Sequence, residues 1–522
     1  MKSKHNPQAV TAQYNKAQAY NTNIDLYNRV RQNENFFIGN QWEGVNAPDL
    51  DKPVFNILKR VVLFFVSSIV SDDISADLSL FGQASPEQEQ ALRLIRQQVD
   101  KVIEKCKVKD KNRTAIRNAA VDGDACFYLT FDPDAESGSE LTSGDIDVEI
   151  IDNTNIYFGN PEVQDVQKQP YILLMMRRDL DTLKDELKGK GVSQNVLDAL
   201  RADDDPNGVN REREEGKITV ITKLWKENGS VWVTQVASNE TIKKPTNTGY
   251  HLYPVAYMSW DSIKNSYHGQ AAVTGLIPNQ IFVNKLFAMS MEHMKKMAFP
   301  KVVYNKAMFP DGFTNKVGEA VGAVGDPNMA VMQNVRAADM SGQVMQLIER
   351  TIDYTRDMMG ASDASLGNVS PENTSAIIAV QKASSMPLEL NKMAFYQFVE
   401  DYIRVMLEIM RVNYGLRMVR FEDETGNVGD VLFDFSMIDS FKMSLNVNIG
   451  AAAYWSELMQ VQTLDNLFAK GIITDAITYL ESIPDGYIRN KGQIIDDIKR
   501  KQEQMMMQQA MMGGMQNALP AM

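Results

Sequence analysis

Apolar residues at helical spacing predict that the chain folds first into helices. Leu26, Val30 and Phe37 fall near one face of a helix. Residues 54–74 are helical in composition. A further helix is predicted over 86–107, because this segment opens with a proline, which suits the first turn of a helix. The opening part of the chain is therefore expected to be helical.

After Ala125 the apolar period changes from that of a helix to that of a strand. Short β-rich runs stand between clusters of Gly, Asp, Asn and Pro, at 126–131, 146–151, 171–176, 218–225 and 231–236. These runs predict a β-rich lobe. Within it, residues 198–215 carry charges of both signs around a Pro-Asn-Gly turn, and we interpret them as a solvated loop.

Two further helices are predicted around a loop-rich insertion. Residues 269–298 have a helical pattern apart from one proline, and the helix is expected to end where Phe299 precedes Pro300. Residues 299–338 are rich in Gly and Pro and are expected to form a small subdomain of short elements. Apolar residues then recur every three or four positions from 340 to 359, which predicts a helix of about 30 Å.

A very long helix is predicted over 375–414, with a kink at Pro387. Its expected buried stripe consists of Met393, Tyr396, Val399, Ile403, Met406, Met410 and Tyr414. The residues before it, 361–374, are rich in Ser, Asn, Asp and Gly. Alternating residues at 441–449 predict a half-buried strand with partners in the β-rich lobe. Short helices are expected over 455–503.

Length and composition indicate an ordered protein with several lobes. The 522 residues are 44% hydrophobic and 23% charged, close to the averages for globular proteins, and their number suggests roughly three or four domains. Cys106 and Cys126 have no partners at metal-ligand spacing, so neither a disulfide framework nor a zinc site is expected. The longest apolar run, 61–70, is about half of the ~20 residues that cross a membrane. Residues 1–22 lack the apolar core of a secretion signal, so the cytoplasm is the default compartment.

The net charge of −13 disfavours tight binding to nucleic acid. Affinity for phosphates comes from Lys and Arg, which displace counterions. The same sign would suit a conduit that does not hold on to DNA, and it would equally suit any acidic soluble protein. Net charge therefore narrows the function without deciding it.

The sequence offers no clear motif for catalysis. The Gly-rich stretch 318–325 lacks the Lys-Ser or Lys-Thr pair of a phosphate-binding loop. The four histidines are scattered without metal-ligand spacing. Acidic groups at 72–73, 203–205 and 496–497 have the chemistry to bind Mg²⁺ in a nuclease, but each lies in a hydrophilic, surface-like context. We expect no enzyme activity, no cofactor and no metal site.

Several short segments, taken in order, carry a resemblance to a known family. They are Phe36, Phe37, Gly39, Asn40, Gln41 and Trp42; Lys52, Pro53, Val54, Phe55 and Asn56; Tyr253, Pro254 and Val255; His268 and Gly269; Gln280, Asn284 and Lys285; Pro300; and Gly360, Gly367, Ser375, Ala376 and Ile377. Ala376 stands where many relatives have glycine. Over about residues 25–450 the chain resembles the portal proteins of tailed double-stranded-DNA bacteriophages.

The resemblance implies an α+β fold, mainly helical, with the wing, stem, clip and crown of a ring-forming subunit. The expected parts are a flexible N-terminal arm at 1–24, a wing at 25–268, a stem helix at 269–298, a clip at 299–338, a second stem helix at 339–360, a tunnel loop at 361–374, the wing's spine helix and returning strands at 375–454, a crown at 455–503, and a disordered tail at 504–522.

The resemblance also implies a function and its partners. Portal proteins form a ring-shaped channel at one capsid vertex, through which the genome is packaged and ejected. The expected partners are further copies of the chain in a ring, usually a dodecamer, with double-stranded DNA, terminase, major capsid protein, scaffold and the neck or tail adaptor. The chain is expected in the virion after assembly in the host cytoplasm. Two alternatives stay open, namely another head-morphogenesis or adaptor protein without a pore, and a Mg²⁺-dependent nuclease.

By this resemblance, two sets of residues are candidates for facing DNA. The tunnel loop would meet phosphates with short polar and acidic side chains, namely Asp363, Ser365, Asn368, Ser370, Glu372 and Asn373. The stem and clip carry Lys285, Lys295, Lys296, Lys301, Lys306 and Lys316 against Glu292 and Asp311, a net charge of +4 over 268–316. The alternative interpretation of the tunnel-loop segment is an ordinary connector between two helices. The alternatives for the lysines are that they face an acidic partner surface, or that their side chains lie over packed neighbours.

Overall fold

The fold is taken from a computed structural model, which describes residues 4–70, 74–80, 85–139, 142–204, 216–299, 301–309, 342–358, 388–422, 428–440 and 443–449, with shorter pieces at 312, 322–326, 328 and 332–335 and within 461–500. The chain divides into two compact units. The first comprises residues 1–70 and 78–445, and the second comprises residues 71–77 and 446–522.

The first unit opens with helices, as the apolar spacing predicts. They are α1 (Pro7–Asn23), α2 (Leu26–Ile38), α3 (Ile57–Ile69), α4 (Pro86–Lys105) and α5 (Val108–Asp122). α4 begins with a capping box, in which the side chains of Ser85 and Gln88 each accept a hydrogen bond from the other's backbone N–H. Reciprocal capping of this kind satisfies two donors that a helix start leaves unpaired.

The N-terminal segment is a packed helix, so the prediction of a flexible arm over 1–24 is wrong for the residues described there, 4–24. Asn6 caps α1 by accepting a hydrogen bond from a backbone N–H in its first turn, at 2.8 Å. Val10 and Tyr14 lie one turn apart on the same face and are buried against the β-rich lobe. Ala17, one turn further on, also packs against this cluster, so one face of a mostly polar helix is held on the lobe.

The predicted β-rich lobe is confirmed, and its larger sheet is antiparallel with the order β4-β5-β6-β7-β8. The strands are β4 (Ile156–Phe158), β5 (Tyr171–Asp179), β6 (Lys217–Glu227), β7 (Ser230–Ala237) and β8 (Glu240–Asn247). α1 packs on one face, and the short helices α6 (Leu180–Gly189) and α7 (Gln194–Ala199) pack on the other. The central strand β6 is therefore buried along most of its length.

The smaller sheet of the lobe has the order β3-β2-β9, with β2 at Asp124–Ser139, β3 at Thr142–Ile151 and β9 at Val255–Ser259. The long helix α11 (Glu389–Asn413) packs against β2 and β9. Its Phe398 and Tyr402 rings lie 4.9 and 5.7 Å from the ring of Phe127 on β2. This aromatic contact joins the second half of the unit to the β-rich lobe.

The buried stripe predicted for the long helix is confirmed along most of α11 and is wrong at its start. Val399, Ile403, Met406, Met410 and Tyr414 are buried. Met393 is instead 60% exposed, Tyr396 is half-buried, and Phe395 and Phe398 occupy the core positions in this part of the helix. The face that meets the sheet is therefore offset from the one predicted. Residues 375–387, with the predicted kink, lie outside the described residues.

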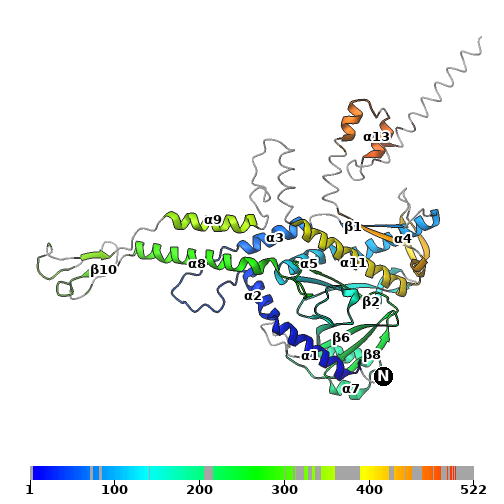
Figure 1. Cartoon of the computed structure of the whole chain (residues 1–522), viewed down its shortest axis with the longest axis horizontal. Coiled ribbons are helices and arrows are strands. Elements are labelled where there is room, and N and C mark those ends of the chain that lie inside the picture. Colours follow the sequence, from blue (N-terminus) through cyan, green and yellow to red (C-terminus); the bar gives the residue numbers. More distant parts are fainter. Residues whose placement is uncertain are drawn as a thin grey trace, which may run out of the picture. The chain divides into compact units, whose positions relative to one another are not determined.

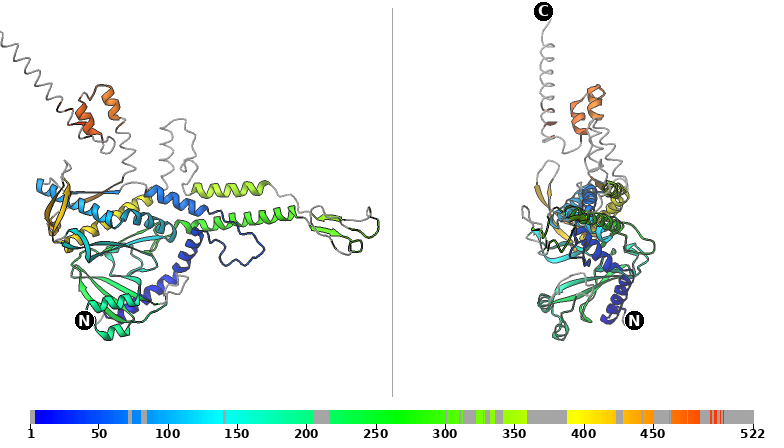
Figure 2. Two further views of the ribbon diagram at one scale, coloured as in Figure 1. Left: turned by 180° about the vertical axis from the view of Figure 1, so that it is seen from behind. Right: turned by 90° about the vertical axis from the view of Figure 1, so that its left-hand side faces the viewer.

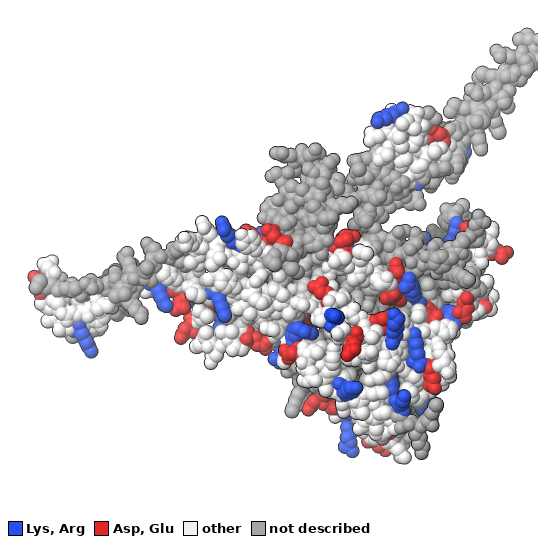
Figure 3. Space-filling view, in the orientation of Figure 1, with Lys and Arg blue, Asp and Glu red and all other residues white. Residues whose placement is uncertain are grey.

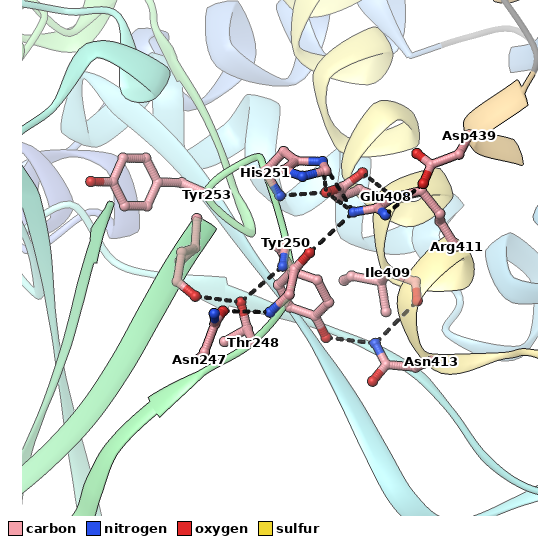
Figure 4. A network of polar contacts seen from close by, with 12 residues as sticks. Asn247, Thr248, Tyr250, His251, Tyr253, Glu408, Ile409, Arg411, Asn413 and Asp439 are labelled. Carbon is pink, nitrogen blue, oxygen red and sulfur yellow. Dashed lines mark hydrogen bonds and ion pairs between the residues drawn. The ribbon is translucent and has the colours of Figure 1, made fainter. Parts of the chain in front are cut away.

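A polar network holds the C-terminal end of α11 to the loop before β9 (Figure 4). Arg411 donates to Glu408 Oε1 at 2.8 Å and to the carbonyl of Gly249 at 3.1 Å, and Glu408 also accepts from His251 N–H. Burial opposes ionisation of Glu408, but these hydrogen bonds hold its pKa below its ordinary value. The network fixes the orientation of α11 on the lobe.

After α11 the chain forms a hairpin of β12 (Leu416–Glu422) and β13 (Val428–Asp434), then a 3-10 turn, η4 (Phe435–Ser440). The predicted strand at 441–449 is confirmed as β14 (Met443–Ile449). Its partner is β1 (Ile74–Leu80), however, and not a strand of the β-rich lobe as predicted. Apolar and polar residues alternate along β1. This is the pattern of a strand, and β1 has the same length as β14.

The helices predicted at 269–298 and 340–359 are confirmed as α8 (Ala272–Ala298) and α9 (Gly342–Met358). The two helices lie side by side and extend away from the β-rich lobe (Figure 1 and the left panel of Figure 2). Beyond their ends, β10 (Lys301–Tyr304) and β11 (Met332–Val335) form an antiparallel pair. The described part of 299–338 thus consists of short elements, as predicted.

In the second unit the described residues include helical turns at 463–469 and α13 (Ala476–Ser482). The rings of Phe468 and Tyr479 lie 4.5 Å apart. Short helices were predicted here, whereas the predicted tail at 504–522 lies outside the described residues. No described helix is long and apolar enough to cross a membrane. Helices and antiparallel strands together confirm the α+β class.

Candidate functional site

The two projecting helices, α8 and α9, form one unit that we call the helix pair. Ile348 and Thr355, two turns apart on α9, are 1% and 2% exposed. Asn279 of α8 donates a hydrogen bond to Thr355 Oγ1 at 3.1 Å. One face of α9 is therefore packed, and its remaining faces are open.

Three buried amide side chains join the base of α8 to distant parts of the sequence. Gln280 Nε2 donates to Phe55 O at 2.8 Å and to Asn284 Oδ1 at 3.0 Å, while Gln280 Oε1 accepts from the first N–H of α3 at 3.1 Å. Asn284 Nδ2 donates to Gln41 Oε1 at 2.7 Å, and Gln41 Nε2 donates to Phe36 O at 2.9 Å. We call Gln41, Gln280 and Asn284 the amide cluster.

The loop between α2 and α3 is held closed and lies against α8. Trp42 Nε1 donates to Pro53 O at 2.9 Å, and the ring of Phe55 stacks on that of Phe287 with 4.1 Å between centroids. In sequence, 243 positions separate Gln41 from Asn284. Three of the segments that carry the family resemblance therefore meet at the base of the helix pair.

A second polar contact holds the residues that lead into α8. His268 Nδ1 lies 2.8 Å from Asp124 Oδ2, and the two side chains are 1% and 0% exposed. Gly269 N–H donates to Asp124 Oδ1 at 2.8 Å. A Cβ atom on Gly269 would lie 2.8 Å from the carbonyl oxygen of Gly123, which explains why glycine occupies this position.

The sequence left three interpretations open, namely a portal protein, another head-morphogenesis protein and a nuclease, and the comparison with known families decides between them. A family model described as phage P22-like portal protein matches residues 13–414, well over half of the chain. The chain belongs to this family. No individual curated protein matches it. Both buried polar contacts and both helices of the pair lie within the matched residues, so the resemblance to portal proteins is confirmed.

The outer surface of the helix pair in this portal protein combines large apolar side chains with charges of both signs. Figure 3 shows uncharged areas on it between separate Lys, Arg, Asp and Glu side chains. Phe282 and Met289 on α8 are 43% and 66% exposed, and Leu347 and Tyr354 on α9 are 47% and 62% exposed. Large apolar side chains in solvent are typical of a surface that another molecule covers.

Two of the six lysines predicted as a basic set have acidic partners in the structure. Lys295 pairs with Asp51 at 2.5 Å, and Lys296 pairs with Glu292 at 2.8 Å, one turn earlier on α8. These two lysines therefore already have acidic partners within the chain. The other described members are Lys285 and Lys306, which are exposed, and Lys301, which lies on β10; Lys316 is outside the described residues.

The six predicted tunnel-loop residues all lie outside the described residues, which end at 358 and resume at 388. They are Asp363, Ser365, Asn368, Ser370, Glu372 and Asn373. The two described helices on either side of this segment are α9 and α11. The assignment of these residues to a DNA-facing loop therefore stays a prediction.

Of the acidic groups considered for Mg²⁺, the structure describes only Asp203 and Asp204. Asp203 accepts a hydrogen bond from Thr219 N–H at 2.9 Å and pairs with Arg177 on β5. Its carboxylate thus connects a loop to the larger sheet. Within the described residues no group of three or more His, Cys, Asp or Glu is placed to hold a metal ion.

The amide cluster is the feature that sequence reasoning missed as a unit. Gln41, Gln280 and Asn284 each belong to the segments that suggest the family, but their separation hides their contact. One signal was present on α8, where Gln280 and Asn284 lie one turn apart on a face otherwise made of Leu276, Ile277 and other apolar side chains. Polar residues on an apolar face need buried partners.

Proposed function

We propose that this portal protein assembles with copies of itself into a closed ring, a dodecamer as in the family at large, around a channel that conducts double-stranded DNA. The observation that carries this proposal is the open outer surface of the helix pair. It offers two different faces, one on α8 and one on α9. Two unlike faces on one subunit are what a ring of identical subunits requires.

The open face of α8 is a stripe along the helix. Its exposed residues recur every three or four positions, as Phe282, Lys285, Met289, Glu292 and Lys296. Side chains at this spacing form a continuous seam on a helix. A seam of this kind suits packing against another helix, because its apolar members leave water on contact.

Over its whole length α9 has the opposite net charge to α8, and its open face carries both signs. Its exposed stripe comprises Leu347, Arg350, Tyr354 and Asp357. α8 carries three lysines and one glutamate, a net charge of +2, whereas α9 carries two arginines and three carboxylates, a net charge of −1. We therefore place α8 of one subunit against α9 of the next. Opposite charges then favour the contact and fix its direction around the ring.

In this proposal the helix pair is the stem, residues 299–338 are the clip, the lobe within 25–268 is the wing, and residues 455–503 are the crown. Terminase and then the neck or tail adaptor dock at the clip and wing, and the capsid protein and scaffold contact the ring during assembly. The net charge of −13 supports passage of DNA without tight binding. Residues 361–374 are proposed as the tunnel loop. The chain catalyses no reaction in this role.

The test is the mass and the image of the purified full-length chain. Native mass spectrometry is expected to give one large oligomer, and negative-stain images are expected to show a ring with a central hole. A chain that stays monomeric at every concentration contradicts the proposal. A closed particle without a hole favours a head-morphogenesis protein without a pore. Cleavage of DNA that depends on Mg²⁺ favours the nuclease.

A further inference from the structure

The first turns of α8 contain a weak point. Pro278 lies inside the helix, where it has no N–H to donate to the carbonyl of Thr274, and Gly275 lies one turn before it. Proline in a helix interior removes one hydrogen bond, and glycine lowers the cost of bending. Among the described residues, no atom outside the helix's own backbone lies within 4 Å of a Cβ atom built on Gly275. The face of α8 at this glycine is therefore open within that part of the chain, whereas the adjoining Leu276 and Ile277 are buried.

The amide cluster lies immediately after this weak point. Gln280, Asn284 and Gln41 are 1%, 3% and 7% exposed, so all three are shielded from water. Through them α8 is bonded to the carbonyl of Phe36 near the end of α2, to the carbonyl of Phe55 in the loop, and to the first N–H of α3. Each of these three hydrogen bonds joins Gln280 of α8, or Gln41 that is bonded to α8, to an element outside the helix pair.

The geometry of these bonds resists bending of α8. A change in direction at Pro278 would move Gln280 and Asn284 away from three elements at once. Each broken bond would leave a buried donor or acceptor without a partner, at about 1–3 kcal/mol per group. An amide that loses its buried partner finds no other hydrogen-bond partner among apolar side chains. The cluster therefore favours one direction of the helix far more strongly than apolar packing, which tolerates sliding.

We propose that the amide cluster is a positioning device, in which Gln41, Gln280 and Asn284 fix the direction of the helix pair relative to α2 and α3 across the weak point at Gly275 and Pro278. The contact is within one subunit, so the device acts before assembly. Its consequence for the channel rests on the proposed function. If the helix pairs form the stem of a ring, their direction sets the width of the channel that they surround.

The direction of the helix pair is measurable as a distance in the full-length chain. Spin labels are placed at Asn23→Cys at the end of α1 and at Met294→Cys on α8, both at exposed positions. The native Cys106 and Cys126 are buried and do not compete for label. Labelled chain is mixed with excess unlabelled chain, so that double electron–electron resonance reads the distance within one subunit. The variants tested are Gln41→Leu, Asn284→Leu and the double variant.

A matched control lies on the same helix. Ser290 is 5% exposed, and its hydroxyl donates to the carbonyl of Leu286 in its own helix at 2.8 Å. Ser290→Ala therefore removes one buried hydrogen bond from α8 without touching another element. It is expected to leave the distance distribution as narrow as in the wild type.

Each single variant is expected to broaden the distance distribution and to lower the Tm, because the amide that remains loses its partner. The double variant is expected to regain part of the lost Tm, because replacing both partners by apolar groups removes that penalty. Its distribution is expected to stay broad. A narrow distribution at the wild-type distance in the double variant would overturn the proposal, since the amides would then serve stability alone.

The outcome does not depend on the ring. Monomers with a narrow distribution in the wild type and a broad one in the variants would contradict the proposed assembly and would support the positioning device. Rings in which every variant keeps the wild-type distance distribution would support the proposed assembly and would contradict the positioning device.

Discussion

Lys223 is the least expected residue in the interior of the β-rich lobe. It lies in the middle of β6 and is 1% exposed, and its Nζ donates to the carbonyl of Lys4 at 2.7 Å. The ammonium group also lies 5.2 Å from the ring centroid of Tyr171 and 5.7 Å from that of Trp225. Burial, assisted by the charge of Lys4, lowers the pKa of Lys223 to about 8. Folding therefore opposes its protonation.

This lowered pKa predicts a pH dependence of stability. Between pH 8 and 10.5 the unfolded chain holds the proton on Lys223 and the folded chain does not, so the free energy of unfolding rises with pH across this window. The gain is roughly 1–3 kcal/mol after allowance for screening by solvent. Urea denaturation followed by circular dichroism at several pH values in the window measures it. Lys223→Met is expected to lose the dependence, whereas Lys244→Met, at an exposed position of β8, is expected to keep it. Identical curves for Lys223→Met and the wild type would contradict this account.

Asp124 is a buried charged residue whose loss is expected to lower stability substantially. It accepts hydrogen bonds from Gly269 N–H and from His268, both at 2.8 Å, and is fully buried. Asp124→Ala leaves these donors unpaired and is expected to cost about 2–4 kcal/mol. The control is Asp185→Ala, which breaks an exposed pair with Lys188 and is expected to change stability by less than about 0.5 kcal/mol. If Asp124→Ala and Asp185→Ala lowered the midpoint of thermal unfolding equally, the buried contact would contribute no more stability than the exposed pair.

At the scale of single elements, α1 illustrates how a few contacts order a polar segment. Tyr14 packs edge-on against Tyr157 of β4, with 5.3 Å between ring centroids. Tyr14→Ala is expected to weaken docking of α1 by about 3 kcal/mol, because it removes a large buried side chain. Limited trypsin digestion is then expected to cleave rapidly after Lys16. Asn15→Ala, at an exposed position of the same helix, should leave Lys16 as protected as in the wild type.

The elements that the sequence predicts well are those with a strong local period. The strands β2, β3, β5, β6 and β7 and the helices α8 and α9 each show a clear local period, so their existence follows from local pattern, whereas β4, β8 and β9 were not predicted. The N-terminal helix could not be found in this way, because its fully buried apolar side chains are few, namely Val10 and Tyr14. β14 was predicted as a strand but given the wrong partner, since local alternation says nothing about which strand lies beside it.

The candidate site shows the same division. The family resemblance named Gln41, Gln280 and Asn284, but only the fold brings them into contact, because the first and the last are 243 positions apart. The lysine set shows the reverse case. Six lysines on neighbouring segments suggested a common role, yet Lys295 and Lys296 have acidic partners within the chain. The net charge of a segment can be read from its sequence, whereas the ion pairs that its lysines form depend on where their side chains point.

At the scale of the whole molecule, the proposed ring sets two opposing demands. The channel should hold DNA weakly, which the net charge of −13 favours. The same charge makes identical subunits repel one another, and this repulsion grows as salt is lowered. Assembly must then depend on local contacts that offset the repulsion. The open faces of α8 and α9 carry large apolar side chains between charged ones, and the two helices are opposite in net charge, so they meet this need in the proposed contact.

A charged substitution in the middle of the α8 stripe separates assembly from folding. Met289 is 66% exposed in the single chain, so Met289→Glu is expected to leave the Tm of the isolated subunit nearly unchanged. In the proposed ring the same position lies against α9 of the next subunit, whose net charge is −1. A carboxylate there would be desolvated and would face charges of its own sign, so the oligomer is expected to dissociate at concentrations at which the wild type stays assembled.

The matched control is Met437→Glu, which makes the same change at an exposed position of η4, away from the helix pair. Sedimentation velocity over a range of concentrations distinguishes the two variants. Because the control adds the same charge to a chain that is already acidic, it accounts for any loss of assembly that comes from net repulsion alone. Dissociation of both variants to the same extent would therefore assign the effect to net charge. Dissociation of neither would remove α8 from the interface.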